Sequence, residues 1–335
     1  SRPPSRPAAA WAEARLPLAV MLGRRPVLAA GALALAGCAS PPRTAATTIA
    51  WQRLAAGVYV WPGAHGLPTA GNAARVGNAG LVVGPDGALL IETGVSARHG
   101  RALLAGIDAL GVPPLRLAVI THAHQEFLFG IAALRERGIA VGMSAAAARL
   151  MLARCDNCLK NLRALLGEAE MAGSALLRPD RELDGLERLP GLGREVQLLH
   201  LGLAATPGDL AVWDAGSGTL FAGGLVDALR IPDLQDGQLP AWRAALARLA
   251  ALPDLTRIVP GHGPVGGPEL IARQLAYFDA LEARVKALLA GGASLAEVTE
   301  QAELPAFRHW AGYDSLHRRN VSLVYLRLEQ ALLDG

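Results

Sequence analysis

Short runs of hydrophobic residues, bounded by Gly, Pro or Asp, recur along most of the chain. Runs of this length are typical of β-strands. A Pro-Asp-Gly turn at residues 85–87 divides one run and predicts a hairpin. The predicted strands lie within residues 57–63, 78–94, 115–120, 139–144, 195–202, 209–224 and 256–263.

Segments with helical spacing of apolar residues alternate with these strands. They lie at residues 96–111, 129–137, 145–170, 239–251 and 267–290, with a helical tail at 291–335. Strands interleaved with helices in two similar halves indicate an α/β fold. We therefore expect two central sheets covered by helices on both outer faces.

The composition changes this picture little. With 335 residues, 52% of them hydrophobic, the chain can bury a large core. Its pI near 9 comes from residues 1–37, which hold five arginines and one glutamate, while the rest is close to neutral. No lysine-rich stripe or aromatic platform accompanies that charge, so nucleic-acid binding is not expected.

Residues 21–40, MLGRRPVLAAGALALAGCAS, have the layout of an export signal: an arginine pair, a short apolar run and Leu-Ala-Gly-Cys. The last four residues resemble the bacterial lipobox, which implies cleavage after residue 37 and lipidation of Cys38. We expect a periplasmic protein whose only membrane attachment is this lipid. A plain secretory signal with a chance cysteine is the alternative, and export by the Sec or the twin-arginine route stays open.

The boundaries of the predicted parts follow from the same reading. Residues 1–20 are interpreted as an over-extended reading frame upstream of Met21, and residues 38–52 as a tether rich in Pro, Ser, Thr and Ala. The globular domain is expected at 53–290 and the helical extension at 291–335.

Cys155 and Cys158 form a C-x-x-C pair. In an exported protein such a pair is a disulfide, a redox pair or half of a zinc site. No second C-x-x-C completes a structural zinc site, so a local disulfide is the favoured interpretation.

The segment THAHQEF at residues 121–127 follows a predicted buried strand. In an extended segment residues two apart point the same way, so His122 and His124 can chelate one ion through neutral imidazole nitrogens. A second predicted strand leads into VPGHGPVGG, where His262 lies in a Gly-rich turn. The remaining histidines are assigned to structure or surface, His65 excepted.

Five segments in order, NAGLVVGPDGALLIETG, THAHQEFLFG, LGLAATPGDLAVW, LFAGGLV and VPGHGPV, resemble the metallo-β-lactamase superfamily. The resemblance implies an αββα four-layer sandwich with a two-metal cleft at one edge of the sheets. Three more segments, CDNCLKNLRALLGEAEMAGS, RIPDLQDGQLPAWRAAL and HWAGYDSLHRRNVSLVYLRLE, look like the quinoprotein relay system zinc metallohydrolases. This implies an association with a periplasmic quinoprotein dehydrogenase.

The family pattern is only partly present. Glu126 replaces the Asp of the motif T-H-x-H-x-D-H, and Glu92 replaces a supporting Asp. The family ligands retained or conservatively replaced are His122, His124, Glu126 and His262. The family ligands lost are Phe127, Ala205 and Gly224, the last in place of a bridging Asp. Two ions need a bridging carboxylate and about three ligands each, so a binuclear site is not expected.

Two functions remain. In the first, one zinc or iron ion is held by the retained residues, and metal-bound hydroxide attacks an ester, lactone or thioester, with Glu126 as a ligand or general base. His65 and Asp227 are candidate replacement ligands or cleft residues. In the second, the site holds no metal and the protein is a catalytically inactive accessory or binding protein of a quinoprotein pathway. The small-molecule substrate is left open.

Overall fold

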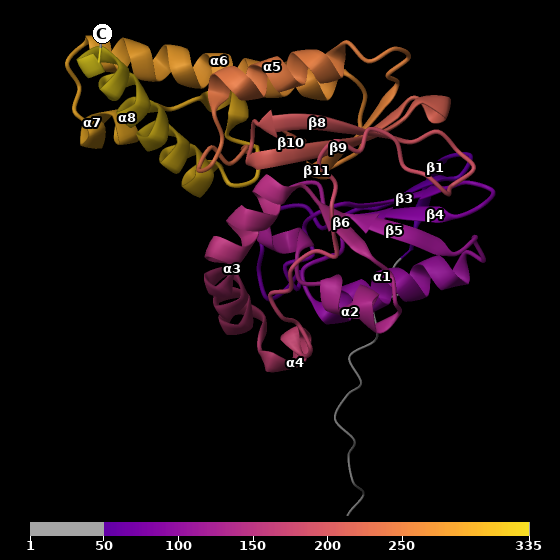
Figure 1. The fold of residues 1–335 in the computed structure, drawn as a ribbon. Coiled ribbons are helices and arrows are strands. Elements are labelled where there is room, and N and C mark those ends of the chain that lie inside the picture. The colour runs from indigo at the N-terminus through magenta and orange to yellow at the C-terminus, as the bar shows by residue number, and fades with distance from the viewer. Residues whose placement is uncertain (1–49, 335) are drawn as a thin grey trace, which may run out of the picture. The chain divides into compact units, whose positions relative to one another are not determined.

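The computed structural model describes residues 50–334, which form two stacked β-sheets with helices on their outer faces (Figure 1). The predicted signal peptide, the lipidation site Cys38 and nearly all of the tether lie outside the described residues. Within residues 50–334, each helix is too short or too polar to cross a lipid bilayer.

The first sheet has seven strands that lie side by side in chain order. Its first four strands pair antiparallel and the later ones pair parallel. The predicted hairpin is confirmed, since Gly84 N donates to Gly87 O at 2.9 Å. The strands are β1 (Gln52–Ala55), β2 (Val58–Trp61), β3 (Ala79–Val83), β4 (Ala88–Ile91), β5 (Leu115–Val119), β6 (Val141–Met143) and β7 (Arg181–Glu182).

The second sheet has four strands in the order β11-β10-β9-β8. Only β10 and β11 run parallel, so their carboxyl ends meet at one edge, and their register places Asp227 opposite His262. The strands are β8 (Gln197–Leu203), β9 (Pro207–Asp214), β10 (Thr219–Asp227) and β11 (Arg257–His262).

Four helices cover the outer face of the first sheet. Ser96 and Ser144 begin two of them by accepting hydrogen bonds from backbone N–H groups of the first helical turn. Apolar side chains such as Leu104, Leu134 and Met151 then pack against the sheet. The helices are α1 (Ala97–Ala109), α2 (Ile131–Glu136), α3 (Ala145–Leu166) and α4 (Glu168–Met171).

The outer face of the second sheet is covered by the remaining helices, which include the predicted helical tail (Figure 1). Trp242 and Phe278 are buried there, and Trp242 Nε1 donates to Leu225 O at 2.9 Å. The helices are α5 (Leu239–Ala250), α6 (Glu269–Ala290), α7 (Leu295–Gln301) and α8 (Arg318–Asp334).

Between the two sheets lies a third apolar layer. It joins Val82 and Leu89 of the first sheet to Val212 and Phe221 of the second. Sheet packs on sheet and helices pack outside, so the predicted αββα sandwich with a C-terminal helical region is confirmed.

Candidate metal centre

The candidate site lies where strands of both sheets end. β5 leads through Thr121 into the short 3-10 turn Gln125–Phe127, which carries Glu126. β11 ends at His262, and β10 ends at Asp227 beside it. The carboxyl ends of strands in α/β sheets are the usual place for a ligand site.

Three side chains meet at this point. Nδ1 of His124 lies 2.5 Å from Oε2 of Glu126, and Nε2 of His262 lies 3.9 Å from Oε1 of Glu126. One ligand atom from each residue falls within 4.8 Å of the other two. Glu126 and His262 are buried, whereas the His124 side chain is 26% exposed.

Two ligand atoms of this group lack a hydrogen-bond partner. Nε2 of His262 and Oε1 of Glu126 are buried and make no hydrogen bond within the described residues, whereas the buried Nδ1 of His124 and Oε2 of Glu126 form an ion pair with each other. Leaving buried polar atoms unpaired costs about 1–3 kcal/mol each. Two imidazoles and a carboxylate are a donor set that suits zinc or iron(II), so the group fits one such ion.

The charges of the group are strongly coupled. Burial alone lowers the pKa of His124, but the adjacent Glu126 carboxylate outweighs it and the net shift is upward. Burial alone raises the pKa of Glu126, but His124 and Arg230 reverse the shift and hold it well below its usual value. Glu126 is therefore an ionised ligand candidate.

Asp227 orients one imidazole. Nδ1 of His262 donates to Oδ1 of Asp227 at 2.9 Å, and Asp227 N donates to Oε1 of Gln274 at 2.9 Å. This pairing leaves Nε2 of His262 directed at Glu126. A carboxylate that fixes the ring of a ligating histidine is a common outer partner in metal sites. His65, the other candidate replacement ligand, is exposed in a loop and does not line the cleft.

His122 lies beside the group, but its Nδ1 contacts other residues than the ligand candidates. Its Nδ1 accepts a hydrogen bond from Gly224 N at 3.2 Å and lies 2.8 Å from the hydroxyl of Thr121. Burial, with the nearby positive charges, keeps the pKa of His122 well below its ordinary value. Thr121 also donates to Glu92, whose pKa burial raises to about 8. The structure thus brings His124, Glu126 and His262 together and leaves His122 in a separate network.

Two of the three positions of lost ligands, Phe127 and Gly224, lie beside His122. The ring of Phe127 is buried with its centroid 4.9 Å from that of His122 and 5.4 Å from that of His262. A Cβ at Gly224 would lie 2.8 Å from Nε2 of His122, so a side chain there would point at this imidazole. Ala205 is buried and lines the neighbouring cleft.

Arg230 was not predicted from the sequence. It is 5% exposed, and its Nη2 lies 3.7 Å from Oε1 of Glu126. It stands in the connection after β10, as the first residue of RIPDLQDGQLPAWRAAL, a segment whose family resemblance did not assign it to the site. Only the fold brings this cation to the site.

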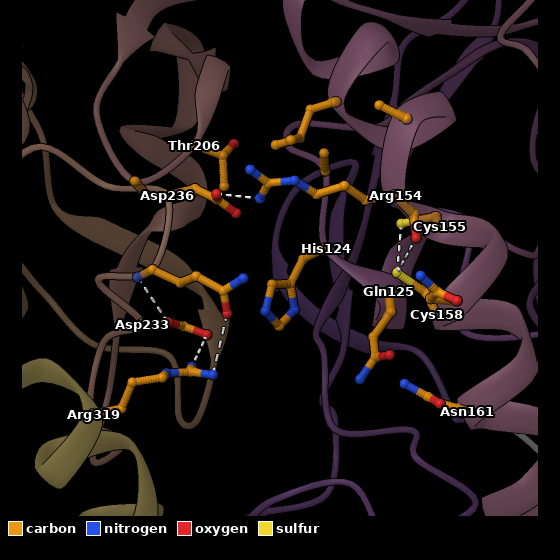
Figure 2. A pocket seen from close by; sticks show the side chains of 16 residues that line it. His124, Gln125, Arg154, Cys155, Cys158, Asn161, Thr206, Asp233, Asp236 and Arg319 are labelled. Atoms are coloured by element: carbon orange, nitrogen blue, oxygen red, sulfur yellow. Dashed lines mark hydrogen bonds and ion pairs between the residues drawn. The ribbon is translucent and has the colours of Figure 1, made fainter. Parts of the chain in front are cut away.

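A cleft of about 520 Å³ opens beside His124 (Figure 2). One wall is α3, which contributes Arg154 and Asn161, and an ion pair joins Arg154 to Asp236 on the opposite wall. Cys155 and Cys158 lie on the α3 wall with their Sγ atoms 2.6 Å apart. Both are free cysteines in the structure, and the disulfide between them stays a prediction.

An αββα sandwich with histidine and carboxylate side chains converging at its strand ends defines a candidate metalloenzyme. Residues 73–262, more than half of the chain, match the family described as "Metallo-beta-lactamase superfamily". The chain belongs to this superfamily. The quinoprotein relay subgroup remains a prediction from the sequence.

Individual relatives agree with this assignment. "Metallo-beta-lactamase type 2" from Bacillus sp. (strain 170) is 24% identical over 209 residues, which cover 61% of this chain and 74% of the relative. "Metallo-beta-lactamase from Pontibacter korlensis" superposes with a TM-score of 0.54 at 24% identity, over 68% of this chain and 97% of the other. The FIM-1 enzyme from Pseudomonas aeruginosa "in the Mono-Zinc Form" gives a TM-score of 0.50 at 22% identity, over 67% and 91%. These structures show the fold.

Proposed function

We propose that this protein is an exported, lipid-anchored hydrolase that uses one metal ion, zinc or iron, held by His124, Glu126 and His262. The observation that carries the proposal is the set of ligand atoms in these side chains, which lie within 4.8 Å of one another, with Nε2 of His262 and Oε1 of Glu126 buried and without a hydrogen bond among residues 50–334. The mono-zinc form of FIM-1 supports the idea that this fold holds a single zinc ion.

The chemistry that such an ion supplies when bound is the acidification of a water molecule to a nucleophile near neutral pH. The proposed substrates are therefore small molecules with an ester, lactone or thioester bond. The protein's own part is to orient His262 through Asp227 and to keep Glu126 ionised. The cleft beside the partly exposed His124 has the size of a small-molecule site, and its walls hold both polar and apolar side chains.

A second candidate is a catalytically inactive binding or accessory protein of a quinoprotein pathway. One observation favours it: His124 and Arg230 already lie beside Glu126 and can balance its charge without a metal. A buried carboxylate that is paired with cations in this way needs no metal ion for stability.

Hydrolysis assays separate the two candidates. The protein is stripped of metal, reloaded with zinc or iron(II), and tested on a panel of aryl esters, lactones and thioesters. Turnover that depends on the metal and is lost in Glu126→Gln, but kept in the matched variant of exposed Glu300, Glu300→Gln, is expected for the hydrolase. No turnover of any substrate of the panel after reloading would favour the binding protein, and turnover that does not depend on metal would contradict both candidates.

A further inference from the structure

Arg230 is an unusual residue for its surroundings. Its side chain is 6% exposed, and its Nη1 is buried with no hydrogen-bond partner within the described residues. The shortest approach to a carboxylate is the 3.7 Å between Nη2 and Oε1 of Glu126, which is longer than a hydrogen bond. Buried arginines normally use their planar fork to bind carboxylates through two hydrogen bonds. A structural ion pair therefore does not account for this one.

The backbone holds Arg230 in this place at some cost. Leu229 has a positive φ of 54°, a conformation that costs an L-residue with a large side chain about 1–2 kcal/mol. Ala311 fixes the strained segment on both sides, because its N donates to Leu229 O at 2.9 Å and its O accepts from Ile231 N at 3.0 Å. Ala311 lies between α7 and α8, so the C-terminal extension fixes the backbone on both sides of Arg230.

Two positions near the ligand group are those where the superfamily pattern has the ligands of a second ion. Phe127 and Gly224 stand where the superfamily pattern has a histidine and the bridging aspartate, and Phe127 packs between His122 and His262. With the bridging carboxylate gone, two divalent ions would face each other with too little negative charge between them. A fixed guanidinium beside Glu126 supplies one positive charge and needs no ligands.

We propose that Arg230 acts as the second cation of this site: it neutralises part of the charge of Glu126, restricts the centre to a single metal ion and lowers the affinity of the centre for that ion. The inference rests on the proposed function, because it takes His124, Glu126 and His262 as the ligands. Arg230 is a positioning and charge-setting residue, and it does not bind the ion.

The test is the zinc affinity of purified protein, measured by competition with a chromophoric chelator. Removing the charge in Arg230→Gln or Arg230→Met takes away a cation that repels zinc and competes for Glu126, so affinity should rise by about tenfold or more. Arg230→Lys keeps the charge and should bind zinc within about threefold of the wild type. Arg319→Gln removes an arginine that lines the cleft beside His124 and is the control.

Three results would overturn the inference. Zinc affinity that is unchanged or weaker in both neutral variants would make Arg230 a support for Glu126. Equal gains in Arg230→Lys and Arg230→Gln would show that charge is not the cause. Loss of the folded state in both neutral variants, seen by circular dichroism, would assign Arg230 to structural stability.

The same zinc measurements test the single-metal hydrolase separately from the role of Arg230. Wild-type protein that binds no zinc contradicts the single-metal hydrolase. If the neutral variants then bind zinc, Arg230 has prevented metal binding and the inference stands. If no variant binds zinc, both proposals fail.

Discussion

The two sides of this site differ in how their histidine and carboxylate side chains are paired. On one side, His124, Glu126 and His262 bring buried ligand atoms together, and in the described part of the chain Nε2 of His262 and Oε1 of Glu126 make no hydrogen bond. On the other side, Nδ1 of His122 accepts from the backbone of Gly224, and Phe127 fills the space beside its ring. The comparison teaches that losing ligands does not leave an empty half-site. The protein has closed one half with its own contacts and kept the other open to a ligand.

The largest effect is expected in the closed half, the side of the site formed by His122, Gly224 and Phe127. This half depends on the packing of the Phe127 ring. Phe127→Ala removes a buried ring that touches His122, His262 and Gly77. The free energy of unfolding should fall by about 3–5 kcal/mol, because deleting a buried aromatic ring leaves a cavity. Denaturant unfolding measures the loss, with Leu332→Ala at an exposed position as control. A loss below about 1 kcal/mol would mean that this half is not a packed core.

The next prediction compares the two halves directly. His262→Ala removes a ligand of the open half and should weaken zinc or iron binding by more than about a hundredfold, or about 2.7 kcal/mol. His122→Ala removes a histidine of the closed half and should change the affinity far less. Equal losses in the two variants would place His122 among the ligands and abolish the distinction between the halves.

A buried histidine outside the ligand group gives a prediction for how the stability of the fold depends on pH. His99 packs against Trp61, and burial lowers its pKa to about 3. Since the folded protein favours the neutral imidazole, this stability is complete above pH 6.5 and is lost as the pH falls from 6.5 toward 3. About 2 kcal/mol should be lost between pH 7 and pH 5 from this group.

The measurement is the free energy of unfolding against pH for the wild type and for His99→Gln. The variant should show a flatter profile between pH 7 and 5, whereas His309→Gln, at an exposed histidine, should follow the wild type. Parallel profiles for all three proteins would contradict a neutral, buried His99.

The smallest effect is expected from the residue that orients a ligand. Asp227→Asn keeps the shape of the side chain but weakens its hold on Nδ1 of His262. Metal affinity should fall by about tenfold, the lower end for outer partners of ligating histidines. The same chelator competition measures it. Unchanged affinity would mean that the ring of His262 is fixed by other contacts.

The sequence predicted the architecture well because its signals were local. The strand β4 is a continuous apolar run, β5 is apolar except for Arg116, and the turn at residues 85–87 has the residues that its geometry needs. β1 and β7 were missed because both are short, polar and at the edges of the first sheet. Such strands carry too little hydrophobic pattern to be recognised.

The site was predicted in part for a related reason. His124 and His262 stand in motifs that follow predicted strands, so their convergence could be anticipated. Arg230 and the hydrogen bond from Gly224 to His122 depend on contacts between distant segments. Those contacts exist only after the sheets and the C-terminal extension have packed together, so no local sequence pattern predicts them.

The central claim is that the open half holds one ion. The most direct test is the metal content of protein purified from the periplasm without a His tag, measured by inductively coupled plasma mass spectrometry beside Glu126→Gln. The account predicts about one zinc or iron per chain in the wild type and a marked loss in the variant. Metal well below one per chain, or an amount that Glu126→Gln leaves unchanged, would contradict it.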